Sequence, residues 1–246
     1  MPLDVAMIAA DTTRSRAYLH ALIRHDLLPA YVLVLENSET ARLPGQLARA
    51  GNVARRFGQA GDDDCWSEAD FDAGIPLREL LESAAVDYGI APARDINDPA
   101  VVATIAARPE AVMIYSGYGG VLLKANVLAT GKRFLHVHGG YLPDYKGSTT
   151  NFYSLITENT MGASAIFLTE HIDSGPILMR RKFPAPVDRI GIDHVSDSAA
   201  RAKVLADVLR AYAATGEWKV ALQNEGGDTY YIIHPVLKHI AIMAAD

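Results

Sequence analysis

Short apolar segments alternate with amphipathic helical segments through the first half of the chain, and this alternation most constrains the fold. Leu3–Ala10 is an apolar run of strand length, residues 14–25 have apolar side chains at helical spacing, and residues 31–35 form a second β-rich run. A strand, a helix and a strand in this order form a βαβ unit, in which the helix covers one face of a parallel pair. The N-terminal part of the sequence therefore predicts a parallel α/β fold.

The same alternation continues to residue 138. We expect helices over 76–85, 98–107 and 122–128, and strands over 111–115 and 133–138. The polar segment 37–73 is expected to contain a small helix near 44–51 and otherwise loops. These elements predict an α/β fold with a doubly wound, mostly parallel, Rossmann-like sheet, in which ligands bind at the carboxyl ends of the strands.

After Pro143 the pattern changes. Residues 164–168 and 176–179 are short β runs, which predict a hairpin or a mixed-sheet pair. A long amphipathic helix is expected over 195–212, then a short strand at 230–235 and a final apolar run. The sequence therefore predicts a catalytic domain over residues 1–190. A short mixed extension, residues 191–246, is expected to pack on it.

Composition excludes several classes of function. The net charge of −6 argues against a nucleic-acid-binding surface, which needs clustered Lys and Arg. The single cysteine, Cys65, excludes an internal disulfide and a multi-cysteine metal site, and its acidic neighbours disfavour a thiolate nucleophile. No apolar run approaches the roughly 20 residues that span a bilayer, and the first residues lack a basic signal-peptide region. We expect a cytoplasmic protein that binds neither nucleic acid nor membrane.

His136 and His138 are the residues best placed for chemistry. Two residues apart in a strand, they project from one face at its carboxyl end, and glycines follow directly. Asp173 lies in a turn bounded by Gly175 and Pro176. Three interpretations are open: hydrogen-bonded core histidines, a zinc or iron site with two imidazoles and a carboxylate, or general acid–base chemistry.

The stretch 116–178 resembles the core of the folate-dependent formyltransferases, which act on glycinamide ribonucleotide, methionyl-tRNA or amino sugars. The matching residues are His136-Val137-His138, Leu142-Pro143, Lys146-Gly147 and Asp173-Ser174-Gly175-Pro176-Ile177-Leu178. The resemblance implies direct transfer of a formyl group from N10-formyltetrahydrofolate to an amine, with His136, His138 and Asp173 as catalytic residues and no metal. His136 stands where most of the superfamily has Asn, and its implied role is to donate a hydrogen bond to the oxyanion.

A longer string, from His136 to Thr150, together with residues 231–237, resembles a narrower branch of the superfamily. This branch contains the sugar-nucleotide formyltransferases of the pseudaminic-acid type. It implies that the acceptor is a nucleotide-linked amino-dideoxy sugar and not a tRNA. The length of the chain agrees, since we expect little room for a C-terminal tRNA-binding domain. The apolar run 239–245 is as compatible with a homodimer interface as with a core.

The resemblance also implies binding residues. The pterin would lie between a turn and a loop, held by Gly119, Gly120, Val121, Leu122, Thr169, His171 and Ile172. Taken alone, the glycine turn is an ordinary strand-to-helix connection. The acceptor or its phosphates would contact Thr12, Thr13, Arg14, Lys146, Ser148, Thr149 and Thr150. Helix capping accounts equally well for Thr12 and Thr13, and Ser148 or Thr149 could cap a helix that runs through Ile156.

Three other functions remain open from the sequence. A hydrolase on the same scaffold would release formate from the folate. A metal-dependent hydrolase would need zinc or iron. A catalytically silent module would bind folate or a sugar nucleotide without turnover.

Overall fold

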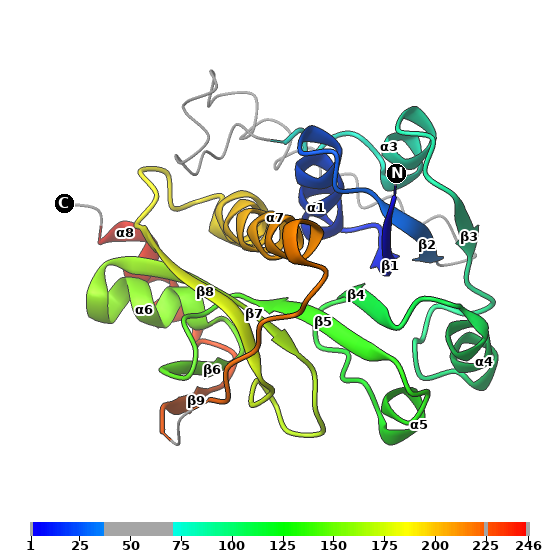
Figure 1. The fold of residues 1–246 in the computed structure, drawn as a ribbon. Helices are drawn as coiled ribbons and strands as arrows, with labels where there is room; N and C mark the ends of the chain where they lie inside the picture. Colours follow the sequence, from blue (N-terminus) through cyan, green and yellow to red (C-terminus); the bar gives the residue numbers. More distant parts are fainter. Residues whose placement is uncertain (1, 37–70, 224–225, 245–246) are drawn as a thin grey trace.

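The computed structural model describes residues 2–36, 71–223 and 226–244. In these ranges the central sheet has the strand order β3-β2-β1-β4-β5-β7-β8 (Figure 1). Its strands are β1 (Leu3–Ala10), β2 (Pro29–Leu35), β3 (Tyr88–Ile90), β4 (Val112–Ser116), β5 (Arg133–His138), β7 (Thr160–Phe167) and β8 (Ile177–Pro184). The first five strands in this order pair in parallel, and β7 pairs antiparallel with both β5 and β8. The predicted α/β class and mostly parallel sheet are confirmed.

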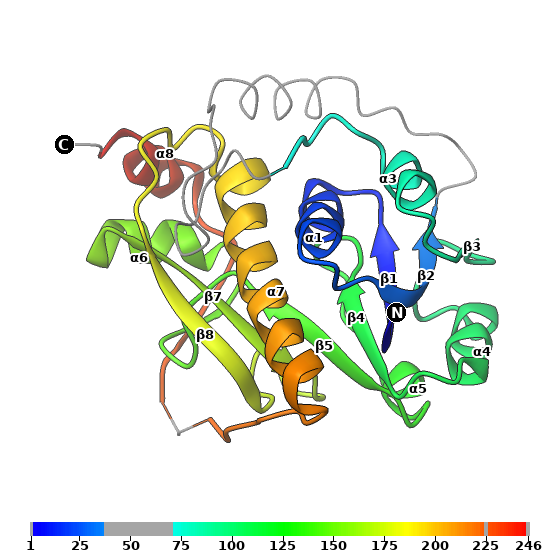
Figure 2. The ribbon, with the colours of Figure 1, turned by 45° about the horizontal axis from the view of Figure 1, so that its top comes forward.

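Helices cover both faces of the sheet. One hydrophobic cluster joins it to α1 (Thr13–Arg24), α3 (Leu77–Ser83) and α7 (Asp197–Thr215), and a second joins the opposite face to α4 (Pro99–Ala107) and α5 (Ala125–Leu128). In Figure 2, α1 and α7 lie side by side over the sheet. Along β1, Val5 and Met7 belong to the first cluster and Ala6 and Ile8 to the second. This alternation follows from the two-residue period of a strand, and it buries both faces.

A second, two-stranded sheet lies beside the carboxyl edge of the main one. In it β6 (Tyr145–Gly147) pairs in parallel with β9 (Asp228–Tyr230). Along the chain, α6 (Thr150–Glu158) comes after β6, and α8 (Pro235–Met243) comes after β9. The π-helical turn η2 (Ile192–Ser196) leads into α7. The pairing brings the C-terminal segment against the loop that follows the histidines (Figure 1).

Several predicted boundaries were wrong. The C-terminal strand ends at Tyr230 and not at 235, because its partner β6 ends at Gly147, opposite Tyr230. Pro235 instead begins α8, where a missing N–H costs nothing. β3 and β6 were not predicted, since three residues give no detectable period. The β7–β8 pair is a hairpin as predicted, but it extends back to Thr160 and on to Pro184. The predicted helix near 44–51 and Cys65 lie outside the described residues.

No helix in the described part of the chain is long and apolar enough to cross a membrane.

Candidate active site

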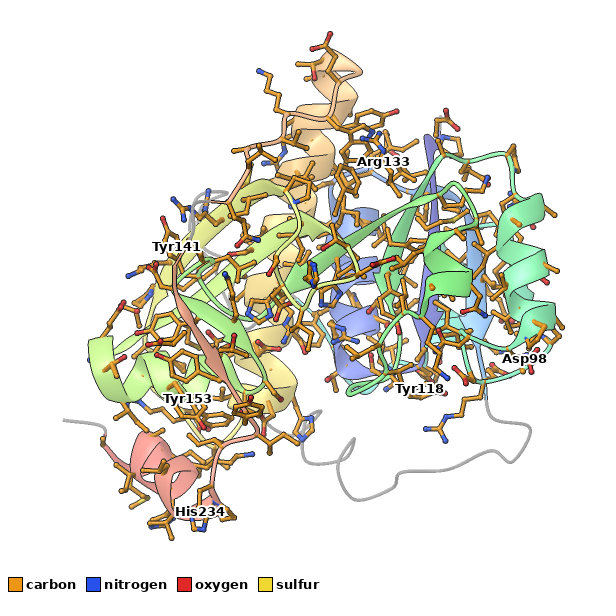
Figure 3. The ribbon with its side chains drawn as sticks, turned by 90° about the horizontal axis from the view of Figure 1, so that it is seen from below. Asp98, Tyr118, Arg133, Tyr141, Tyr153 and His234 are labelled. Atoms are coloured by element: carbon orange, nitrogen blue, oxygen red, sulfur yellow. The ribbon has the colours of Figure 1, made fainter. Side chains whose placement is uncertain are left out.

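β5 carries the two histidines to the carboxyl edge of the sheet. Leu135 and Val137 pack in the cluster under α1 and α7, whereas Phe134 packs in the opposite cluster. His136 and His138 therefore share the face of Phe134, as predicted. In Figure 3, Arg133 marks the amino end of β5, and Tyr118, just after β4, marks the carboxyl edge of the sheet. A cavity of about 600 Å³ lies at the carboxyl edge, and both histidines line it.

His138 has acceptors at both ring nitrogens. Its Nδ1 lies 3.3 Å from Asp173 Oδ2, and its Nε2 lies 2.8 Å from the Tyr145 carbonyl oxygen. Both side chains are buried, with 6% and 10% exposure. Burial lowers the pKa of His138, and the Asp173 carboxylate opposes this shift in part. A neutral imidazole has one N–H for these two acceptors, so one of the two contacts is made without a proton.

Three hydrogen bonds hold the turn that carries Asp173. Its backbone is left-handed (φ 49°), a conformation that Asp tolerates better than most residues. Its Oδ2 accepts the Gly147 N–H at 2.8 Å. Gln223 Nε2 donates to the carbonyl oxygens of Asp173 and Gly175, at 2.8 and 2.7 Å. The C-terminal segment thus fixes the turn that presents the carboxylate.

His136 lies beside β4 and is partly exposed. Its Nδ1 is 3.2 Å from the Tyr115 carbonyl oxygen, and its ring centroid is 6.1 Å from that of Tyr115. Burial lowers the pKa of His136 well below its usual value, and the nearby Arg14 and Arg201 guanidiniums lower it further. The ring is therefore neutral near pH 7.

Two guanidiniums form a positive wall beside the histidines. Arg14, from α1, donates to Ser116 Oγ at 3.2 Å and to the Gly117 carbonyl oxygen. Arg201, from α7, donates to the Val137 carbonyl oxygen at 2.9 Å and pairs with Asp197, whose Oδ2 is 2.7 Å from Arg201 Nε. Burial lowers the pKa of Arg14, and the charge of Arg201 lowers it further.

Two glycines, Gly139 and Gly140, let the site side chains pack closely against the end of β5. A Cβ on Gly140 would lie 2.6 Å from His138 Nε2 and 2.7 Å from the Tyr145 carbonyl oxygen. A Cβ on Gly139 would overlap Asp197 Oδ1 and the Arg201 guanidinium. The glycines that follow the histidines in the sequence are therefore required by packing.

The structure brings most of the predicted binding residues to the cavity. Its lining includes Arg14, Gly119, Gly120, Val121, Leu122, Ser148, Thr149, Thr150, Thr169 and Ile172. Four predicted residues do not line it: Thr12, Thr13, Lys146 and His171.

The contacts of these outlying residues explain their positions. Thr12 caps α1 by accepting the Ser15 N–H, Thr13 is buried, and Lys146 Nζ donates to the Gly226 carbonyl oxygen at 2.9 Å. His171 is exposed on its loop. Thr149 stands at the N-cap of α6, but its hydroxyl accepts the Ile233 N–H at 2.9 Å and does not cap the helix.

Sequence reasoning missed Arg201, Asp197, Asn151 and Gln223. The i,i+4 spacing of Asp197 and Arg201 on the predicted long helix was a detectable ion-pair signal. Asn151 Nδ2 donates to Asp197 Oδ1 at 2.8 Å. The contact of Asn151 and the contacts of Gln223 join residues far apart in the sequence, so no local sequence pattern indicates them.

The described part of the chain offers no ligand set for the metal interpretation. Among the described residues no three or more His, Cys, Asp or Glu side chains are grouped so that they could hold an ion. The two nitrogens of His138 already face a carboxylate and a carbonyl oxygen.

Comparison with known proteins agrees with this geometry. The family model described as formyl transferase matches residues 4–202. A curated methionyl-tRNA formyltransferase from Herpetosiphon aurantiacus is 31% identical over 137 residues, which are 55% of this chain and 44% of that protein. The chain thus spans less than half the length of the curated relatives it matches.

Two solved structures share the fold. One, from Mycobacterium tuberculosis, is proposed to be a sugar N-formyltransferase; the TM-score is 0.53 at 16% identity, over 92% of this chain and 75% of that one. The other is HypX from Aquifex aeolicus in complex with tetrahydrofolic acid; the TM-score is 0.53 at 12% identity, over 95% of this chain and 30% of that one. Since the family model covers most of the chain, this protein belongs to the formyl transferase family.

Proposed function

We propose that this protein transfers the formyl group of N10-formyltetrahydrofolate to the amine of a nucleotide-linked amino-dideoxy sugar. One observation carries the proposal: the buried His138–Asp173 pair opens on a cavity of about 600 Å³ at the carboxyl edge of a formyl transferase fold. A cavity of this size suits small-molecule substrates.

The transfer proceeds by direct attack. The neutral amine bonds to the formyl carbon, and the carbonyl electron pair moves to oxygen, giving a tetrahedral oxyanion. The oxyanion forms beside His138, in the positive field of Arg14 and Arg201. When the bond from carbon to N10 breaks, the carbonyl re-forms and the proton lost by the amine reaches N10. Asp173 orients His138 and helps to move that proton.

The folate has a suitable flank in the cavity. The turn at Gly119–Leu122 and the loop with Thr169 and Ile172 both line it. Leu122 and Ile172 are large apolar side chains that are 63% and 53% exposed, so a flat pterin between them would cover apolar surface. The tetrahydrofolic acid bound to HypX supports a folate as donor in this chain as well.

The sugar nucleotide rests on narrower support. The string from His136 to Thr150 and the segment 231–237 resemble the sugar-modifying branch, and a proposed sugar N-formyltransferase shares the fold. Tyr230 and Tyr231 line the cavity, and Tyr230 stacks on Tyr145 at 5.4 Å between ring centroids. Aromatic and hydroxyl groups of this kind suit a sugar ring and a base. A homodimer stays a prediction.

One experiment tests donor and acceptor together. The protein is incubated with N10-formyltetrahydrofolate and a panel of amines: dTDP- and UDP-linked amino-dideoxyhexoses, glycinamide ribonucleotide and methionyl-tRNA. Mass spectrometry should find a formyl mass gain on a sugar nucleotide. If methionyl-tRNA alone were formylated, the acceptor would be the tRNA and not a sugar nucleotide. Formate without any formylated amine would favour the hydrolase, and thermal stabilisation without turnover would favour a binding module.

A further inference from the structure

The hydrogen bond between His136 and Tyr115 decides which nitrogen of His136 faces a substrate. The Tyr115 carbonyl oxygen can only accept, so Nδ1, 3.2 Å away, must carry the proton. In a neutral imidazole the other nitrogen, Nε2, then holds a lone pair. Within the described residues Nε2 has no hydrogen-bond partner, and the ring lines the cavity.

The groups around His136 keep it neutral. Arg14 approaches from α1, Arg201 from α7, and His138 from the same strand, and each lowers the pKa of His136. Two carboxylates that line the same cavity are already engaged: Asp173 with His138 and the Gly147 N–H, and Asp197 with Arg201 and Asn151. A second proton on His136 would place a third positive charge beside Arg14 and Arg201. The imidazole therefore presents an acceptor, and the oxyanion-donor role implied by the resemblance does not fit this tautomer.

We propose that His136 Nε2 accepts a hydrogen bond, and then a proton, from the amine under attack. This inference rests on the proposed function. As the C–N bond forms and the carbonyl pair moves to oxygen, the amine nitrogen becomes acidic and its proton passes to Nε2. The proton then goes to the His138–Asp173 pair, which delivers it to N10 as the C–N10 bond breaks. Asn, usual at this position, can accept a hydrogen bond but cannot take the proton.

The tautomer can be tested without any substrate. Nitrogen-15 NMR of the full chain labelled at histidine distinguishes protonated from unprotonated ring nitrogens, and the signals missing from His136→Asn assign His136. At pH 7 we expect a proton on Nδ1 and none on Nε2. A proton on Nε2, in either the other tautomer or the imidazolium, would overturn the proposal. This measurement stands even if no acceptor is ever formylated.

Chemical rescue tests the role in turnover. His136→Ala is assayed in single turnovers with N10-formyltetrahydrofolate and a dTDP-linked amino-dideoxyhexose, with added 1-methylimidazole or imidazole. Neutral 1-methylimidazole accepts a proton but cannot donate one. We expect it to raise the rate at least about 10-fold, increasingly as pH rises through its own pKa. Rescue only by protonated imidazole, declining as pH rises, would show a donor and contradict the proposal.

The substitution His136→Asn adds a second readout. It keeps a hydrogen-bond acceptor of similar reach but cannot be protonated. We expect a turnover about 10- to 100-fold below wild type, with little change in KM. Full turnover with the wild-type pH profile would overturn the proposal. If no formyl product forms with wild type either, the proposed acceptor fails, and the NMR measurement alone decides the tautomer.

Discussion

The carboxylate of Asp173 faces the ring of His138, with Oδ2 3.3 Å from Nδ1, and the same oxygen accepts the Gly147 N–H at 2.8 Å. One atom therefore joins His138 to the loop that follows β5. This loop carries Tyr145, whose carbonyl oxygen faces the other ring nitrogen of His138. The ring is enclosed between two acceptors, and its orientation depends on where Asp173 is held.

Asp173→Asn should separate the charge from the architecture. Asn also tolerates a left-handed backbone, and its Oδ1 can accept the Gly147 N–H. We expect turnover to fall at least about 100-fold because the charge that supports proton transfer is gone. Urea denaturation should show a free energy of unfolding within about 1 kcal/mol of wild type. Near-normal turnover would remove the carboxylate from the mechanism.

Gly139→Ala should disrupt the Asp197–Arg201 pair by direct overlap. The added methyl overlaps both side chains, so they must move away from the end of β5. We expect a loss of about 1–3 kcal/mol of stability and a weaker affinity for the substrates. Thermal unfolding and KM check both. Gly119→Ala is the matched control for stability, since a Cβ there meets nothing within 4 Å, and its unfolding temperature should not change.

Stability should fall in mild acid because the fold holds several histidines neutral. Burial lowers the pKa of His136 well below the ordinary histidine value of 6.5, so the unfolded chain takes up a proton first as pH falls. The stabilisation is complete above about pH 6.5 and is lost below it, by at most about 1.4 kcal/mol per pH unit for each such histidine.

His136→Asn removes one such group and gives the control. The free energy of unfolding, measured in urea from pH 8 to pH 5, should fall less steeply in this variant than in wild type. His138 and His20, whose pKa values are also lowered by burial, keep part of the slope. Parallel curves for the two proteins would show that His136 is not held neutral by the fold.

Gln223→Glu should loosen the turn that presents Asp173. Glutamate has a similar size but offers no N–H to the carbonyl oxygens of Asp173 and Gly175. We expect turnover to fall about 10- to 100-fold through misplacement of the carboxylate, with the fold retained. Leu222→Ala, at a neighbouring side chain that is 86% exposed, should leave turnover unchanged. Equal activity in both variants would make Gln223 a surface residue only.

The sequence by itself determined the α/β class, most element positions and the residues of the motif. These are local properties: apolar residues at a period of two or near 3.6 reveal a strand or a helix wherever the chain lies. The spacing of His136 and His138 placed them on one face, because alternate residues in a strand share a face. The formyl transferase resemblance came from the same continuous stretch, and the family model confirms it.

Only the tertiary structure decided the partners of those residues. The sheet order sets β4 beside β5 and the Tyr115 carbonyl oxygen against His136 Nδ1, which decides the tautomer. Packing of α7 on the sheet brings in Arg201, and pairing of β9 with β6 brings the C-terminal segment to the site. These contacts join residues 21 to more than 60 positions apart. No local period records them, since they depend on how distant elements are packed together in space.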